Sequence, residues 1–335
     1  MKFYNFFKSR TGWLVVIIAI LLIYIIYQQD YTKANISWGV SFSKPYAEQL
    51  GLNWRQTYLA ILDDLKVNNL RLSNYWSEIE KAPGQYDFKD IDWQLQEADR
   101  RGVQVILTLG RRQPRWPECH DPAWLKNFPE TESQAKVLQL LRVELEHFKN
   151  YHNIKAWQLE NEPLLSLFGV CPKPDKAFLA EEYALIQSLD PRPVYLTDSG
   201  ELSGWFRVAS LSDYLGTTMY RIVWNKYLGF WSYHLPPALY RLHAYVVQKL
   251  YGQKKIIVTE LQAEPWTWKP MKEMSKDEQN NSMNLTRLSE TISYAKKTGF
   301  TEYYLWGAEW MYWRKLSGDN TFWQETKKLW QPTWR

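Results

Sequence analysis

The sequence predicts an α/β barrel of eight parallel strands, and three observations support this fold. From Ser37 onward, short apolar segments that suit buried strands alternate with amphipathic helical segments. Eight strand candidates fall within about 280 residues, close to the usual length of a (β/α)8 barrel, roughly 250 residues. No glycine-rich phosphate loop follows any strand candidate, which argues against a doubly wound sheet. The expected fold is therefore a (β/α)8 TIM barrel.

The eight strand candidates are short apolar segments, several of which end in polar or aromatic residues. In chain order they cover residues 37–42, 68–73, 103–109, 155–160, 193–198, 214–220, 255–260 and 302–307. Helical periodicity fills the gaps, for example over 54–67, 133–149, 176–188, 237–251 and 280–297. Alternating strands and helices imply a parallel sheet. Residues 322–335 are expected to form the last helix and a short end.

The segment before the barrel predicts a single N-terminal transmembrane helix. Lys2, Lys8 and Arg10 precede an apolar run over 13–27 that has no charge, glycine or proline. No small-residue cleavage site follows this run, which favours a retained signal-anchor, and the basic flank predicts a cytoplasmic N-terminus. The expected organisation is a cytoplasmic segment 1–11, a transmembrane signal-anchor 12–27, a linker 28–36 and an extracytoplasmic barrel domain 37–335.

Composition narrows the class of ligand. Lys and Arg number 41 against 36 Asp and Glu, a balance too small to indicate nucleic-acid binding. The chain is rich in aromatic residues, with 19 Trp, 22 Tyr and 13 Phe, which suits either sugar-binding surfaces or a large aromatic core. No His-x-x-x-His or Asp-x-Asp-x-Asp spacing occurs, so neither a metal nor another cofactor is predicted.

The strand ends carry the residues of a candidate active site, because barrel sites lie at the carboxyl ends of the strands. These residues are Arg71 (second strand), Asn161 and Glu162 (fourth), Tyr220 (sixth), Glu260 (seventh) and Trp306 (eighth). Two facing carboxylates suit glycoside hydrolysis, in which one protonates the leaving oxygen and the other attacks the sugar. The two must differ in pKa, so the proton donor needs apolar or anionic surroundings and the nucleophile needs cations or hydrogen-bond donors.

Four segments carry a family resemblance. They are "WQLENEP" (157–163), "IIVTELQAEPW" (256–266), "LRLSNYWSEIEKAPGQYDFKDID" (70–92) and "YYLWG" (303–307). Together they resemble clan A glycoside hydrolases, of family 5 or a related one, which are barrel enzymes with catalytic glutamates after strands 4 and 7. The resemblance covers roughly residues 37–315.

The resemblance implies a retaining mechanism with Glu162 as acid/base and Glu260 as nucleophile. The substrate-binding residues that it implies are Asn161 at the sugar 2-hydroxyl, Arg71 and Tyr220 beside the nucleophile, and Trp306 under the reacting sugar. Among the other tryptophans of the rim, Trp266 is expected to stack on a sugar.

Each of the two carboxylates has a competitor nearby. Glu160 lies two residues before Glu162 and would share its side of a regular strand, but Pro163 places Glu162 nearest the strand's end. Glu264 lies four residues beyond Glu260, which directly ends an apolar run. Glu162 and Glu260 are therefore preferred, and Glu264 is expected to face solvent or a subsite.

The two cysteines, Cys119 and Cys171, fall in the loops after the third and fourth strand candidates. Adjacent barrel loops on one face can meet, and an extracytoplasmic compartment permits a disulfide. Either a disulfide or two free thiols fits the sequence.

Two functions fit these observations. The preferred one is a membrane-anchored retaining β-glycoside hydrolase that acts on extracytoplasmic oligosaccharides or polysaccharides. The alternative is a non-catalytic carbohydrate-binding barrel attached to the cell surface. The presence of both glutamates favours the enzyme, because a barrel that only binds has no need of both.

Overall fold

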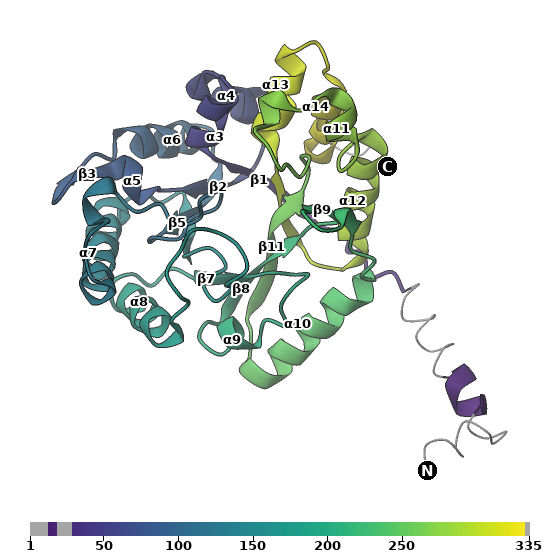
Figure 1. Cartoon of the computed structure of the whole chain (residues 1–335), viewed down its shortest axis with the longest axis horizontal. Coiled ribbons are helices and arrows are strands. Elements are labelled where there is room, and N and C mark those ends of the chain that lie inside the picture. Colours follow the sequence, from purple (N-terminus) through teal and green to yellow (C-terminus); the bar gives the residue numbers. More distant parts are fainter. Residues whose placement is uncertain (1–12, 19–28, 332–335) are drawn as a thin grey trace.

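The computed structural model describes residues 13–18 and 29–331, and its eight predicted strands close into one parallel barrel ringed by helices (Figure 1). In hydrogen-bonded order the strands are β1 (Ser37–Phe42), β12 (Glu302–Trp306), β11 (Lys255–Gln262), β8 (Tyr214–Met219), β7 (Val194–Asp198), β6 (Ile154–Leu159), β5 (Gln104–Leu109) and β2 (Asn69–Ser73). β2 pairs with β1 and closes the barrel. The predicted (β/α)8 barrel is confirmed.

Helices cover the outside of the barrel, and two short antiparallel hairpins extend from it. The α-helices are α3 (Lys44–Gln49), α4 (Trp54–Ala60), α5 (Trp76–Ile79), α6 (Lys89–Asp99), α7 (Glu130–Phe148), α8 (Lys176–Leu189), α9 (Phe206–Ala209), α10 (Pro237–Tyr251), α11 (Lys276–Asn280), α12 (Leu285–Lys297), α13 (Ala308–Leu316) and α14 (Thr321–Lys327). A π-helical turn, η1 (Ile61–Leu65), continues α4, and 3-10 turns form η2 (Ala123–Leu125), η3 (Met271–Glu273) and η4 (Lys328–Trp330). The hairpins pair β3 (Glu80–Ala82) with β4 (Gln85–Tyr86) and β9 (Ile222–Asn225) with β10 (Gly229–Ser232).

The helix predicted over 280–297 is observed as α12 from Leu285 onward, and its first predicted residue, Asn280, is the last residue of α11. The Asn284 side chain accepts a hydrogen bond of 3.0 Å from the Arg287 N–H and so begins α12 as its N-cap. The Ser282 hydroxyl accepts from the Trp266 N–H at 3.0 Å, which ties the break between the helices to the loop after β11. The periodicity continues across the break, so the sequence pattern alone does not reveal it.

The barrel interior is layered along its axis. An ion-pair layer lies at the amino ends of the strands, where the Glu302 carboxylate contacts Lys155 at 2.7 Å and Lys255 at 2.5 Å. An apolar layer follows, formed by Ile106, Ala156, Tyr195, Ile257 and Tyr304. Above it, toward the carboxyl ends, the interior turns polar again at Arg71 and Gln158, which are both buried. The candidate site therefore rests on a packed core and not on a pore.

The predicted transmembrane segment 12–27 lies mostly outside the described residues, as does the predicted cytoplasmic segment 1–11. Of that segment, residues 13–18 are described and are helical. Within the ranges 13–18 and 29–331, no helix has both the length and the apolar character needed to cross a membrane. The predicted linker is partly docked on the barrel, because the Tyr31 N–H donates to the Lys297 carbonyl at 3.1 Å.

Candidate active site

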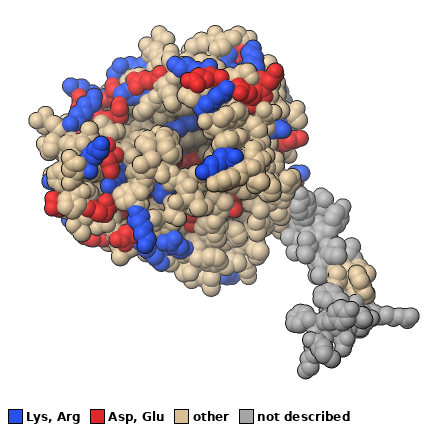
Figure 2. Space-filling model, viewed as in Figure 1, with Lys and Arg blue, Asp and Glu red and all other residues tan. Residues whose placement is uncertain are grey.

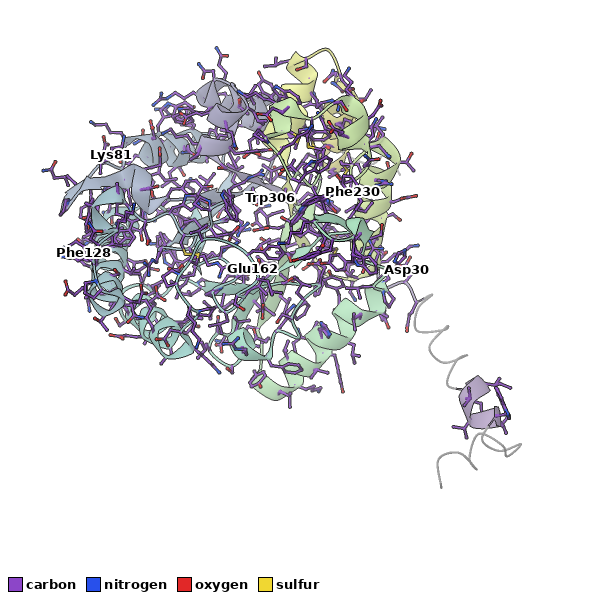
Figure 3. The ribbon with its side chains drawn as sticks, viewed as in Figure 1. Asp30, Lys81, Phe128, Glu162, Phe230 and Trp306 are labelled. Atoms are coloured by element: carbon purple, nitrogen blue, oxygen red, sulfur yellow. A yellow bond between two sulfur atoms is a disulfide. The ribbon has the colours of Figure 1, made fainter. Side chains whose placement is uncertain are left out.

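The carboxyl ends of the barrel strands surround a hollow near the centre of the face shown in Figure 2. The residues predicted there come from five strands or the turns after them: Arg71 on β2, Asn161 and Glu162 after β6, Tyr220 after β8, Glu260 on β11 and Trp306 on β12. Glu162 and Trp306 are labelled on this face in Figure 3. A small pocket lies between Arg71, Arg115 and Trp306. The structure therefore brings the predicted strand-end residues to one rim.

A β-bulge in β11 turns Glu260 toward this hollow. The pairing of β11 with β8 shifts register between Val258 and Glu260, and the pairing with β12 shifts between Val258 and Leu261. Val258 and Leu261 both pack in the core between barrel and helices, although they are three residues apart and would face opposite sides of a regular strand. The extra residue reverses the alternation, so the side chain of Glu260 points inward.

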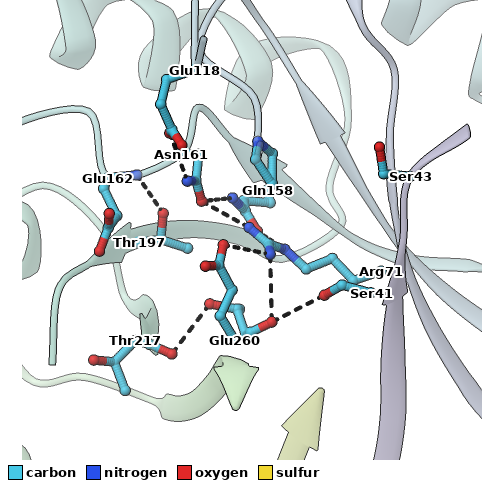
Figure 4. A network of polar contacts seen from close by, with 12 residues as sticks. Ser41, Ser43, Arg71, Glu118, Gln158, Asn161, Glu162, Thr197, Thr217 and Glu260 are labelled. Carbon is cyan, nitrogen blue, oxygen red and sulfur yellow. Dashed lines mark hydrogen bonds and ion pairs between the residues drawn. The ribbon is translucent and has the colours of Figure 1, made fainter. Parts of the chain in front are cut away.

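The Glu260 carboxylate is bound on both oxygens by strong donors. Arg71 Nη1 lies 2.8 Å from Glu260 Oε1 (Figure 4), and the Tyr220 hydroxyl donates to Oε2 at 2.8 Å. Glu260 is 5% exposed and Arg71 is 1% exposed. A carboxylate buried to this degree requires a paired cation and hydrogen bonds, and Glu260 has both.

Arg71 links the nucleophile candidate to the turn after β6. Its Nε donates to Gln158 Oε1 at 2.7 Å, and its Nη2 donates to Asn161 Oδ1 at 2.8 Å. The Gln158 amide also lies 3.3 Å from Asn161 Oδ1. With its oxygen held by these two donors, Asn161 has a fixed orientation and presents its Nδ2 group on the other side.

Glu162 is in the opposite situation. Its backbone has a φ of 45° and its N–H donates to Thr197 Oγ1 at 2.8 Å, which fixes the residue in the left-handed region. Its carboxyl group receives no hydrogen bond from the described residues. Burial and the nearby carboxylates of Glu260 and Glu118 raise the pKa of Glu162 well above its usual range. Glu162 is therefore suited to hold a proton at neutral pH.

Glu160, the competitor of Glu162, does not face Glu260. Its backbone also has a positive φ, 55°, and its carboxylate accepts from the N–H groups of Arg111, at 2.7 Å, and Arg112. Burial raises the pKa of Glu160 to about 7, and its hydrogen-bonding partner Glu182 on α8 lies in the helical layer. Glu160 thus supports the loop after β5 from behind the site.

Glu264, the competitor of Glu260, is buried and does not face solvent. Its carboxylate pairs with Arg115, whose guanidinium also lies 3.6 Å from Glu309 Oε2. The guanidinium is stacked between two rings, 3.6 Å from the centroid of Tyr46 and 3.9 Å from that of Trp306. One face of Trp306 is therefore covered by Arg115, and a sugar would have to use the other face or displace the arginine.

Trp266 lies beside Tyr220, the residue whose hydroxyl donates to Glu260. Its ring meets the Tyr220 ring edge-on, with 5.2 Å between centroids, and it approaches Phe168 at 6.2 Å. The side chain of Gln262 accepts from the N–H groups of Arg221 and Ile222 at 2.8 and 3.0 Å, and so ties the β9–β10 hairpin to β11. A second aromatic group, Trp224 stacked on Trp268 at 5.6 Å, lies beyond it. These rings form an aromatic margin on one side of the site.

Three further charged residues reach the site from loops and were not among the sequence predictions: Glu118, Arg115 and Glu201. Glu201 is partly buried near Glu162 and accepts from the Tyr220 N–H at 2.6 Å and the Tyr240 hydroxyl at 2.7 Å. None of these residues follows an apolar run directly, so the strand-end rule does not find them. Cys119, next to Glu118, forms a disulfide with Cys171, with 5.2 Å between Cα atoms. That neighbouring cysteine is the only sequence signal for Glu118.

The described part of the chain contains no cluster of His, Cys, Asp and Glu arranged to hold a metal ion. The two carboxyl groups of Glu162 and Glu260 differ in their hydrogen-bonding partners. Arg71 and Tyr220 serve Glu260, whereas Glu162 has none. An acid and an anionic nucleophile, side by side, can cleave an acetal such as a glycoside.

Comparisons with known proteins concern the fold of the chain. No model of a protein family matches the sequence. β-Galactosidase BgaA from Clostridium cellulovorans is 20% identical over 177 residues, which cover 45% of this chain and 26% of that protein. Among solved structures, xylanase 10B from Thermotoga petrophila in complex with xylobiose matches with a TM-score of 0.57 and 16% identity, over 82% of each chain. The chain shares its barrel fold with glycoside hydrolases.

Two other solved structures show the same likeness. A family 1 β-glucosidase from Thermotoga maritima matches with a TM-score of 0.53 and 14% identity, over 83% of this chain and 89% of its own. A β-galactosidase from Rahnella sp. R3 matches with a TM-score of 0.56 and 13% identity, over 82% of this chain and 51% of its own. At identities this low, the structural match establishes the common fold and no more.

Proposed function

We propose that this protein is a retaining β-glycoside hydrolase in which Glu162 is the acid/base and Glu260 the nucleophile. One observation carries the proposal. The two carboxyl groups lie close enough for the charge of Glu260 to raise the pKa of Glu162, and only Glu260 has a cation and a hydroxyl donor. Two neighbouring carboxyls with divergent proton affinities are the requirement of glycoside hydrolysis.

The first step of the proposed reaction forms a glycosyl-enzyme ester. A Glu260 oxygen attacks the anomeric carbon, the bond to the leaving oxygen breaks, and Glu162 gives its proton to that oxygen. As the negative charge of Glu260 passes into the new ester, its attraction for the Glu162 proton weakens. Arg71 and Tyr220 hold the attacking carboxylate in place through both of its oxygens.

The second step releases the sugar. Glu162, now ionised, takes a proton from a water molecule as that water attacks the anomeric carbon, and the bond to Glu260 breaks. The free Glu162 carboxyl, which no described residue holds by a hydrogen bond, can serve both steps. Both catalytic groups return to their starting protonation states.

We propose β-linked oligosaccharides or polysaccharides as the substrates. The similar proteins are named as a xylanase, β-glucosidase and β-galactosidases, and one of the xylanase structures holds xylobiose. The aromatic margin with Trp266, Trp224 and Trp268 suits the flat faces of sugar rings. Asn161, held through its oxygen, presents an amide donor to a sugar hydroxyl.

We also propose that the barrel acts outside the cytoplasm, anchored by residues 12–27. The uncharged apolar run, its basic flank and the absence of a cleavage site support an anchor. The Cys119–Cys171 disulfide supports an oxidising compartment, because disulfides persist mainly outside the cytosol.

The catalytic proposal is tested with a panel of activated aryl β-glycosides and with natural β-glycans. We expect the full chain in detergent to hydrolyse at least one of them with retention of configuration. Glu260→Ala should abolish turnover, and azide should restore release of the aryl group and give a glycosyl azide of inverted configuration. Glu132→Ala, on an exposed part of α7, is the matched control and should remain active. If the wild type turns over nothing but binds glycans, the carbohydrate-binding barrel is the correct function.

A further inference from the structure

Glu118 is a third carboxyl at the reaction centre, beside the catalytic pair. It lies in the loop between β5 and η2, and its side chain is 17% exposed. Its Oε2 accepts from Asn161 Nδ2 at 3.2 Å, as the dashed line in Figure 4 shows. Burial and the charge of Glu260 raise the pKa of Glu118 to about 7, so the two carboxyl groups interact electrostatically. The catalytic steps described above leave this residue without a role.

The hydrogen bonds of Glu118 are incomplete. Oε2 has the Asn161 amide and, at 3.8 Å, the Arg112 Nε group, which has no hydrogen bond of its own among the described residues. Oε1 has no hydrogen-bond partner in the described part of the chain. A carboxyl that is mostly enclosed, beside two catalytic carboxyls, has acceptor capacity available for a ligand.

The backbone fixes Glu118 in this position. Glu118 has a φ of 72°, and its backbone carbonyl accepts from the Gln113 N–H at 2.7 Å. The Cys119–Cys171 disulfide joins the loop to the one after β6, and Val170 N–H donates to the Pro117 carbonyl at 2.9 Å. Contacts of the residues immediately before and after Glu118 therefore fix its backbone. A fixed backbone suits a group that must bind a substrate at a defined position.

A purely structural role for Glu118 would be to orient Asn161. Asn161 is already oriented through its oxygen by Arg71 and Gln158, at 2.8 and 3.3 Å, and through its N–H, which donates to the Arg112 carbonyl at 2.7 Å. What Glu118 contacts is the other end of the amide, the donor group that faces away from Arg71. Glu118 and Asn161 Nδ2 thus form an acceptor and a donor side by side.

We infer that Glu118 is a substrate-binding residue, which accepts a hydrogen bond from a hydroxyl of the sugar at the reaction centre while Asn161 donates to the same sugar. The Cys119–Cys171 disulfide holds Glu118 there. This inference rests on the proposed function. A hydroxyl can donate to one partner and accept from another, so an adjacent carboxylate and amide recognise it together. The ligand class is therefore a neutral, hydroxyl-bearing sugar ring.

The test compares the best aryl β-glycoside of the panel with its monodeoxy analogues. In the wild type, the analogue that lacks the contacted hydroxyl should be a poorer substrate by roughly ten- to a hundredfold in kcat/KM, the usual effect of a hydrogen bond to a charged group. Glu118→Ala should lose a similar factor on the parent glycoside, mainly through KM, and should no longer discriminate against that analogue. Glu118→Gln, which keeps an acceptor oxygen, should be intermediate.

A second readout separates substrate contact and charge from a structural effect. The Glu118 carboxylate helps to raise the pKa of Glu162, so Glu118→Gln should move the alkaline limb of kcat/KM to lower pH. Glu132→Gln, on the exposed surface of α7, should change neither the limb nor the discrimination. If an active wild type and both Glu118 variants share the same deoxy discrimination and the same limb, the inference is wrong while the proposed function stands.

The role of the disulfide is tested by a thermodynamic cycle. Cys119→Ser with Cys171→Ser should weaken turnover of the same glycoside, and adding Glu118→Ala should cause little further loss, because both changes remove one contact. Fully additive losses would overturn the link between the disulfide and Glu118. If the wild type binds xylobiose, cellobiose or lactose without turnover, the same variants are compared by calorimetry, with a tenfold weaker affinity expected for Glu118→Ala. A wild type that neither binds nor hydrolyses sugars overturns both proposals.

Discussion

Glu162 and Glu260 have identical side chains, but their neighbours place them in opposite surroundings. Glu260 receives donors on both oxygens, from Arg71 and from the Tyr220 hydroxyl, each at 2.8 Å. Glu162 receives none from the described residues and lies among carboxylates. In the proposed mechanism the proton is therefore held by Glu162, and the position of Arg71 decides which carboxyl is the acid and which is the nucleophile.

Glu162→Gln tests this division at the level of pH. Because the pKa of Glu162 is raised, its proton is present at neutral pH and is lost as pH rises through that pKa, so wild-type kcat/KM should fall on the alkaline side. In Glu162→Gln, a poor leaving group should react roughly 10²–10⁴-fold more slowly. A 2,4-dinitrophenyl glycoside, which needs little protonation, should lose least in the first step.

The same experiment carries its own control. Glu132→Gln, at an exposed position of α7, should keep the wild-type pH profile. Survival of the alkaline limb in Glu162→Gln would assign that limb to another group and remove Glu162 as the proton donor.

The strand-end rule located Glu162, Glu260 and Arg71 because each stands on or directly after an apolar strand. Glu118 lies nine residues beyond Leu109, the last residue of β5, so its position depends on the path of a loop. That path is set by a disulfide and by backbone contacts, which a single sequence does not display. Pro163 correctly favoured Glu162 over Glu160, but the positive φ angles at both residues were not predictable from the sequence.

Among the elements, β11 shows how a local irregularity makes the site. Counted from Ile257, which faces the barrel interior, strict alternation would turn Glu260 outward toward the helices. The bulge before Glu260 restores the inward direction. The sequence predicted the end of the strand correctly, but period-two reasoning alone would have placed the nucleophile on the wrong face.

Two features of the structure depend on tertiary contacts and were not predicted from the sequence pattern of single elements. Arg115 comes from the loop after β5 and covers one face of Trp306 on β12, which are 191 residues apart in the chain. The break between α11 and α12 depends on a cap at Asn284. By contrast, the eight strands and their order along the chain were predictable, because each strand has a local hydrophobic pattern.

The ion-pair layer at the amino ends of the strands makes a prediction about stability. Glu302 on β12 is 4% exposed and accepts hydrogen bonds from Lys155, Lys255 and the Tyr304 hydroxyl, at 2.7, 2.5 and 2.6 Å. Burial opposes ionisation of Glu302, but the two ammonium groups and the hydroxyl outweigh it and lower its pKa to about 2. Because the folded pKa lies below the ordinary value, this contribution to stability is present above that value and is lost as pH falls toward 2.

Glu302→Gln should therefore lower the free energy of unfolding by about 3 kcal/mol at pH 7, since it leaves Lys155 without its buried partner. Urea denaturation at pH 7, 4 and 3 should show the gap between wild type and variant closing as the pH falls. A gap that stays constant with pH would mean that packing, and not the ion pair, is what the variant loses. Glu132→Gln is the surface control and should lie close to wild type throughout.

At the scale of the whole molecule, Tyr31, which follows the predicted anchor in the sequence, and the candidate site lie at opposite ends of the barrel. Tyr31 docks on the Lys297 carbonyl, at the end of α12 and just before β12 begins, so the chain enters at the amino ends of the strands. The catalytic pair lies at the carboxyl ends. Tyr31 comes only four positions after Tyr27, the end of the predicted transmembrane segment, a reach of at most about 14 Å. An anchored barrel would therefore stand on its amino end, with its site facing away from the bilayer.

This orientation is testable with single fluorescent labels on the full chain in lipid vesicles. Lys254 precedes β11 at the amino end, whereas Tyr227, which is 81% exposed, lies in the turn of the β9–β10 hairpin. A label on Lys254→Cys should be quenched by nitroxide-bearing lipids much more strongly than one on Tyr227→Cys, because quenching acts only at short range. Cys119 and Cys171 are disulfide-bonded and should not take the label. Stronger quenching at position 227 would reverse the orientation. A protein that does not sediment with the vesicles would show that residues 12–27 are not an anchor. The predicted orientation relative to the bilayer would then be wrong as well.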